Sequence, residues 1–209
     1  MILPIGTSKL KVLSLIYSEP GIKLTDLIKR ASISVGTAKK TLNDLIKSKV
    51  VEEETIKSGK RILLRKFYPN LKTEEGKAVF TSIELERKQK FLKEHPRLTG
   101  PINHLLREVE VEMLLVFGSF AMGSETRDSD LDLLFLANMD KKNKISKACE
   151  LAFITFDHDV SPRIESLRDF KNNITDSLHK SIIRDHVILY GSEKFIEIIG
   201  KVSLRDLFA

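Results

Sequence analysis

The chain has a single cysteine, no long hydrophobic run and no internal repeat. Cys149, alone among 209 residues, excludes an intrachain disulfide and a cysteine-based zinc site, and its helical surroundings predict a small buried side chain. No apolar run approaches the roughly 18 residues of a membrane span, and the N-terminus lacks a secretion signal. We therefore expect a soluble, cytoplasmic protein without membrane contacts. Hydrophobic residues make up 42% of the sequence, which is enough to form globular cores.

Acidic residues are scarce in the first third of the chain. Residues 1–72 contain 15 Lys and Arg against 6 Asp and Glu, a net charge of +9, whereas the remainder has 20 against 23, a net charge of −3. Such an asymmetry is typical of a protein whose basic part faces nucleic acid.

A short apolar run ends at a glycine in the middle of the chain. Residues 113–117, Met-Leu-Leu-Val-Phe, predict a strand buried on both faces, because the run is too short for a helix. Gly118 allows the backbone to approach a ligand closely, and Ser119 adds a hydroxyl at the start of a short helix through residues 120–122. This arrangement suits a phosphate.

A second apolar run carries two acids. Residues 131–136 predict a strand that is apolar except for Asp132, and Asp130 lies two positions earlier. Side chains alternate along a strand, so the two carboxylates share one face. Two like charges at this separation favour a cation between them, and hard oxygen ligands suit Mg²⁺, which also bridges phosphates.

Together these two runs resemble the DNA polymerase β-like nucleotidyltransferases, in particular their minimal archaeal and bacterial members. The shared pattern is an apolar strand, Gly118-Ser119, ten intervening residues, and Asp130-Leu131-Asp132 in a second strand; the resemblance covers about residues 100–195. It implies transfer of a nucleoside monophosphate from a nucleoside triphosphate (NTP), with Asp130 and Asp132 catalytic and holding Mg²⁺ or Mn²⁺. The alternative, an ordinary turn and two polar strand positions, does not explain an acid among leucines.

Fuller members of that family carry a third carboxylate on a third strand. Here Asp159 is the best candidate for a third catalytic acid, Asp157 and Glu165 are weaker candidates, and the position can also be vacant. His158 is read as an edge residue, and His186 as structural. Gly118 and Ser119 are expected to hold the phosphates, and Arg127 either neutralises charge near the leaving group or is a solvated loop residue.

The N-terminal third predicts three helices, at residues 9–18, 24–30 and 35–46. In the third, Ala38, Leu42 and Leu45 recur at intervals of three or four, which leaves polar and basic residues outward. Small, polar and basic side chains near a helix start are what a recognition helix presents to a major groove. The outward residues are Thr37, Lys39, Lys40 and Asn43.

A hairpin follows, with strands at residues 50–55 and 61–68 and a basic connection at 57–60. Three helices and a basic hairpin resemble the winged helix-turn-helix domain over about residues 8–70. The resemblance implies binding of double-stranded DNA, unless the domain serves only protein contacts. The hairpin residues predicted to contact DNA are Lys57, Lys60 and Arg61.

The other segments are less informative. Residues 71–109 predict a charged helical stretch interrupted at His95-Pro96 and again at Pro101, whose apolar stripe can pack on either domain or on a second copy of the chain. Residues 141–151 and 170–183 predict helices and residues 153–164 a strand, and within residues 183–192 a helix runs into an apolar strand and a Tyr-Gly turn.

The sequence therefore predicts an α+β protein with four parts: a winged helix-turn-helix at residues 1–72, a helical connector at 73–99, a nucleotidyltransferase with a mixed sheet at 100–195 and a tail or helix at 196–209. We expect a metal-dependent nucleotidyltransferase coupled to DNA binding. An alternative is a regulator, or an autoregulating antitoxin, whose transferase domain senses nucleotide or is inactive. The family also includes antitoxins that nucleotidylate a helical toxin-like protein, which is a further candidate acceptor.

Overall fold

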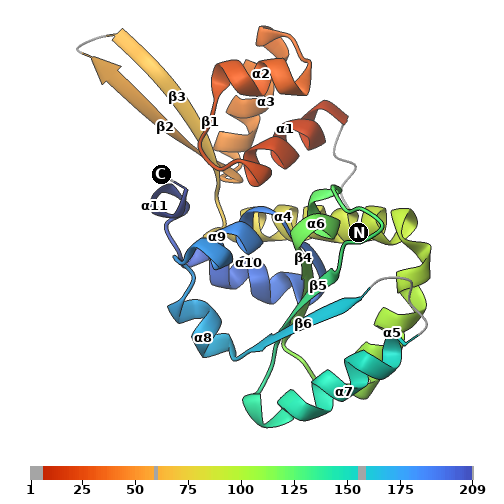
Figure 1. Cartoon of the computed structure of the whole chain (residues 1–209). Helices are drawn as coiled ribbons and strands as arrows, with labels where there is room; N and C mark the ends of the chain where they lie inside the picture. Colours follow the sequence, from red (N-terminus) through yellow and green to blue (C-terminus); the bar gives the residue numbers. More distant parts are fainter. Residues whose placement is uncertain (1–6, 59–60, 155–158, 209) are drawn as a thin grey trace. The chain divides into compact units, whose positions relative to one another are not determined.

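A computed structural model describes residues 7–58, 61–154 and 159–208 (Figure 1). The chain forms two compact units, one of residues 1–83 with 196–209 and one of residues 84–195. Among the helices of the described ranges, none is both long and apolar enough to cross a membrane.

The N-terminal part of the first unit, residues 7–69, forms three helices and a three-stranded antiparallel sheet of order β1-β3-β2. Its helices meet through side chains with no exposed surface, among them Leu13, Leu27 and Leu42. The long hairpin projects away from the helices (Figure 1). The elements are α1 (Thr7–Ser18), β1 (Ile22–Lys23), α2 (Leu24–Ala31), α3 (Val35–Lys47), β2 (Val51–Ser58) and β3 (Arg61–Pro69).

A 21-residue helix, α4 (Glu74–Glu94), follows the sheet, and a 3-10 turn, η1 (Pro96–Leu98), leads into α5 (Thr99–Glu108). The break at His95-Pro96 is confirmed. The break expected at Pro101 is wrong, because Pro101 lies in the first turn of α5, where a missing backbone N–H leaves no intrahelical hydrogen bond unmade.

The second unit is organised around a four-stranded sheet of order β6-β5-β4-β7. β4 (Met113–Phe117) runs antiparallel to both β5 (Leu131–Leu136) and β7 (Val187–Tyr190), and β5 runs parallel to β6 (Val160–Glu165). The two inner strands have the bounds that their apolar runs predicted, and their side chains are buried except near Phe117 and Asp132. The mixed sheet confirms the predicted fold class.

One face of this sheet packs on α5 and on α7 (Lys142–Ala152), which follows the turn η2 (Met139–Lys141). Leu133 and Phe135 of β5 share a buried cluster with Leu105 and with Cys149 of α7. The opposite face carries Asp132, so the helical layer behind β5 holds the strand while its acid faces away.

Two expectations in the last third are corrected. The helix expected at residues 170–183 is two helices, α8 (Leu167–Asn172) and α9 (Ser177–Arg184), because Asn173 ends α8 and the chain turns before α9. The strand expected at 153–164 begins only at Val160, since Phe153 and Ile154 form a turn after α7; residues 155–158 lie outside the described ranges.

The end of the chain forms α10 (Ser192–Gly200) and α11 (Leu204–Leu207). Its last part belongs to the first unit: a Cβ atom added to Gly200 would lie 2.4 Å from the Leu71 carbonyl oxygen, and Arg205 Nη2 lies 3.3 Å from Glu52 Oε2. The C-terminal segment therefore packs beside the base of the hairpin.

Candidate active site and nucleic-acid interface

The turn between β4 and α6 (Gly118–Met122) meets the acid of β5. Gly118 has a φ of +70°, and a Cβ atom added there would lie 2.2 Å from Asp132 Oδ2. Phe117, the residue before it, is the register partner of Asp132. Glycine is thus needed both for the left-handed backbone and for space beside the carboxylate.

Asp132 is a partly buried acid on an inner strand. Burial, and secondarily the negative charge of Asp130, raise the pKa of its carboxyl group above the ordinary aspartate value. Asp130, one residue before β5, is exposed. Burial and repulsion by Asp130 both disfavour the ionised form of Asp132. A cation between the two carboxylates would reduce this cost.

This donor set fits a divalent metal, because two carboxylates on one sheet face supply the hard oxygen ligands that Mg²⁺ or Mn²⁺ takes. Within the described ranges, no cluster of three or more acidic, histidine or cysteine side chains is arranged to hold a metal ion. The candidate centre there is the Asp130–Asp132 pair.

The third strand places a serine beside the pair. Asp132 is in register with Ser161 of β6, whereas Asp159 is exposed and precedes β6, with its carbonyl oxygen accepting a hydrogen bond from Leu131 N at 2.8 Å. Asp159 therefore lies one residue before β6, and its backbone meets the start of β5.

Of the weaker candidates for the third acid, the structure places one. Glu165 lies at the opposite end of β6, level with Leu136, where its buried carboxylate meets His179 Nε2 at 2.9 Å and pairs with Arg163. Its partners already satisfy it, away from the aspartate pair. Asp157 and His158 lie outside the described residues.

The loop between α6 and β5 carries an interaction that sequence reasoning missed. His95 Nε2 lies 3.6 Å from Glu125 Oε1, and the His95 ring lies between Phe91 of α4 and Phe120 of α6, with centroids at 4.6 and 5.5 Å. This contact ties the loop to the end of α4. Arg127 is exposed on the same loop. No motif marks this pairing, since the two residues are 30 positions apart and only the fold joins them.

Two other candidate groups are structural. Burial raises the pKa of the Cys149 thiol to about 11, so it remains a protonated, inert side chain. His186 is buried between the Ile182 carbonyl oxygen, 3.0 Å from Nδ1, and Glu84 Oε1, 3.2 Å from Nε2. Its ring bonds hold elements of the second unit together.

In the first unit, α3 presents the polar face that its sequence predicted. Ala38, Leu42 and Leu45 have no exposed surface. Ser34 caps the helix, accepting a hydrogen bond from Thr37 N at 3.1 Å, and its hydroxyl also bonds the Thr37 hydroxyl at 2.9 Å. The residues exposed on the other side are Thr37, Lys39, Lys40 and Asn43.

The hairpin is a charged, two-stranded ribbon. β2 and β3 pair from Val51–Pro69 to Ser58–Arg61, with a bulge between Ile56 and Lys57. Lys57 is exposed on β2; Lys60 lies outside the described residues, and of Arg61 only the backbone, in β3, is described. The two strands are therefore paired up to the last described residues on either side of residues 59–60.

The second unit combines a mixed sheet with a Gly-Ser turn packed against a strand acid, as a nucleotidyltransferase domain does, and the first combines three helices with a hairpin, as a winged helix-turn-helix does. Comparisons with known families agree. Residues 101–195 match the model of the polymerase β nucleotidyltransferase family, and residues 7–52 match a winged helix-turn-helix DNA-binding family.

A relative from Methanocaldococcus jannaschii, named "putative protein adenylyltransferase", is 26% identical to this chain over 80 residues, which are 38% of this chain and 79% of the relative. No solved structure matches the chain.

Proposed function

We propose that the second unit transfers a nucleoside monophosphate from an NTP to an acceptor group, releasing pyrophosphate, and that the first unit binds double-stranded DNA. The observation that supports the transfer is the contact between the Gly118 turn and Asp132. It places the start of the short helix α6, whose backbone N–H groups suit phosphates, beside the Asp132 carboxylate. Burial and the charge of Asp130 disfavour the ionised form of this carboxylate, which a bound cation would stabilise.

Each candidate residue has a role that follows from its position in the site. Asp130 and Asp132 would hold Mg²⁺ or Mn²⁺, which when bound neutralises triphosphate charge and orients the phosphate for in-line attack. The backbone N–H groups of Gly118 and Ser119 would hold the phosphate tail, and Arg127 would add positive charge from the adjacent loop. His95 and Glu125 position this loop from α4.

The name of the relative bears on the nature of the acceptor. The relative is named for transfer to protein, which favours a protein acceptor, such as a helical toxin-like partner, over a small molecule. The third acid is a separate question. The residue of β6 in register with Asp132 is Ser161, and the acid nearest in sequence, Asp159, lies one residue before the strand. We assign Asp159 as the third acid.

A second function has its own support. If Asp159 does not act, the described site has two acids and no third, which favours a regulator that binds NTP without transferring it. In this alternative the winged helix reads DNA, in an autoregulatory role, and the nucleotide changes its affinity.

The test incubates the full chain with each labelled NTP, Mg²⁺ or Mn²⁺, and an extract of the source cells, and follows label entering protein. Asp130→Asn and Asp132→Asn should each reduce transfer by at least about 1,000-fold, because each removes a metal ligand. Full transfer activity in Asp159→Asn would remove Asp159 from the catalytic residues. Nucleotide binding by calorimetry without any transfer in the wild-type protein would favour the regulator, and unchanged NTP affinity in the Asp130→Asn, Asp132→Asn double variant would refute the metal assignment.

A further inference from the structure

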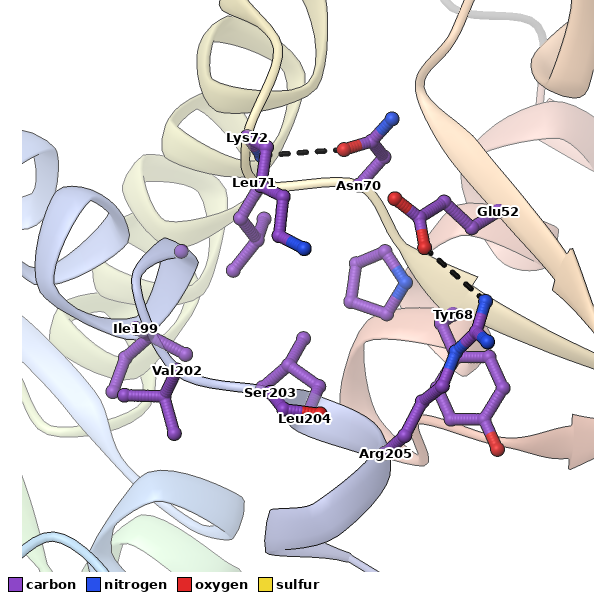
Figure 2. Close-up of a pocket in the computed structure, with 12 residues that line it drawn as sticks. Glu52, Tyr68, Asn70, Leu71, Lys72, Ile199, Val202, Ser203, Leu204 and Arg205 are labelled. Carbon is purple, nitrogen blue, oxygen red and sulfur yellow. Dashed lines mark hydrogen bonds and ion pairs between the residues drawn. The ribbon is translucent and has the colours of Figure 1, made fainter.

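The first unit contains a pocket that neither the transfer reaction nor DNA binding uses. It has a volume of about 300 Å³ and lies between the base of the hairpin, from Tyr68 to Lys72, and the C-terminal segment, from Ile199 to Arg205 (Figure 2). This volume is at the lower end of the range of ligand pockets and suits a small metabolite.

The walls of the pocket are fixed by specific contacts. Arg205 pairs with Glu52 and its guanidinium lies 5.2 Å from the centroid of the Tyr68 ring, while the Tyr68 hydroxyl donates to Glu54 at 3.0 Å. Close packing of Gly200 on Leu71 closes the other side, where an added Cβ atom would meet the Leu71 carbonyl oxygen. The pocket therefore exists only while the C-terminal segment is docked.

The lining has an excess of positive charge and of hydrogen-bond donors. Its charged side chains are Lys72, Arg205 and Glu52, and the only carboxylate among them is already paired with Arg205. In Figure 2 the Lys72 amine extends into the space between Leu71 and Leu204, and no ion pair involves it within the described ranges. Asn70 uses its side-chain oxygen to accept from Lys72 N at 3.2 Å, which leaves its amide N–H groups to donate.

We propose that this pocket binds a small organic anion, a carboxylate or phosphate monoester, through the Lys72 ammonium and the Asn70 amide, with its apolar part against Leu71 and Leu204. A ligand here touches both the hairpin base and the C-terminal segment, so its binding stabilises their contact. The anion thereby acts on the DNA-binding unit from a site distinct from the candidate active site.

The proposal is tested on the full chain with two probes, citrate and inorganic phosphate, titrated by calorimetry without metal and at constant ionic strength set with chloride. Wild-type protein should bind at least one probe saturably. Lys72→Gln should weaken that binding by about 10- to 100-fold, the loss of one charge-assisted hydrogen bond, and Lys72→Arg should retain most of it. The two probes distinguish carboxylate from phosphate recognition.

Lys201→Gln is the matched control, because it removes the same charge from an exposed position in the same segment that does not line the pocket. It should bind the probe like the wild-type protein. Hydrogen exchange of the backbone amides of residues 204–208 should slow when the probe is added to wild-type protein and stay unchanged in Lys72→Gln. Equal affinities of Lys72→Gln and Lys201→Gln, or no saturable binding of either probe, would overturn the proposal.

Discussion

The two units place their functional side chains in opposite ways. On α3 the residues predicted to contact DNA are exposed side chains on one face of the helix. In the second unit, Gly118 and Asp132 are in contact, and burial together with Asp130 raises the pKa of Asp132. One surface is a set of independent side chains, and the other is a site whose parts constrain each other.

This difference predicts how each region responds to substitution. Independent exposed groups contribute separately, so single changes on α3 should give modest and additive effects. Groups in contact are coupled, so one added methyl group at Gly118 displaces the carboxylate that a metal needs. The predictions below test this contrast, from the largest expected effect to the smallest.

Among the variants that test this contrast, the largest effect is expected for Gly118→Ala. The new Cβ atom would overlap Asp132 Oδ2, and the residue would also have to hold a φ of +70°, which costs an L-residue about 1–2 kcal/mol. Transfer activity should fall at least about 100-fold, as expected when a catalytic group is displaced by about 1 Å. Labelled-NTP transfer and thermal unfolding of the same preparation measure the two effects.

Gly123→Ala provides the matched control. Gly123 ends α6 with a φ of +66°, yet a Cβ atom there would meet no atom within 4 Å. The variant should lose similar stability to backbone strain and keep most of its transfer activity. If both variants lose transfer equally, strain in α6 and not contact with Asp132 explains the loss, and the coupling between Gly118 and Asp132 is refuted.

The sequence predicted local features well and distant contacts poorly. The bounds of β4 and β5 could be predicted because apolar runs ended at Gly118 and began after Asp130, both local signals. The face of α3 followed from its helical period. The contact of Gly118 with Asp132, by contrast, depends on the pairing of Phe117 with Asp132, and the His95–Glu125 contact depends on how α4 meets the loop.

The errors have local causes as well. Pro101 was read as a helix break, although a proline in a first turn is tolerated. The apolar residues of 170–183 favoured one helix, but the turn at Asn173 to Asp176 divides it. The role of the chain end was not predictable, since nothing in residues 199–205 indicates packing against a hairpin more than 100 residues earlier.

The next effect concerns α3. Lys40→Gln should weaken binding to every duplex and make the slope of log K against log salt less negative by about 0.9, the loss of one phosphate contact. Asn43→Ala should instead reduce discrimination between promoter and random DNA by about 1–3 kcal/mol, because an asparagine reads base edges. Fluorescence anisotropy of the full chain on both duplexes measures these effects.

The double variant Lys40→Gln, Asn43→Ala tests additivity on α3. Its effects should equal the sum of the single effects, unlike those of coupled residues. Lys9→Gln, at an exposed position of α1, controls for loss of net charge. Unchanged discrimination in Asn43→Ala would mean that α3 does not read base edges and that the basic unit only tethers the protein to DNA.

The smallest effect is expected in the stability of metal-free protein that carries Asp132→Asn. The pKa of Asp132 is raised in the folded state, so its carboxyl binds a proton more tightly there than in the unfolded chain. Stability from this group is fully present below the ordinary aspartate pKa and is lost as pH rises through the raised folded value. At neutral pH the ionised group therefore destabilises the fold, although solvent screens the effect because Asp132 is only partly buried.

Asp132→Asn should raise the melting temperature slightly at pH 7 and make no difference below pH about 3. Adding Mg²⁺ should raise the melting temperature of the wild-type protein and leave that of Asp132→Asn unchanged. Asp128→Asn, at an exposed position of the same loop, is the control. If the wild-type protein melts at a higher temperature than Asp132→Asn at pH 7 without metal, the ionised carboxylate of Asp132 is stabilised by a partner within the protein and needs no bound cation.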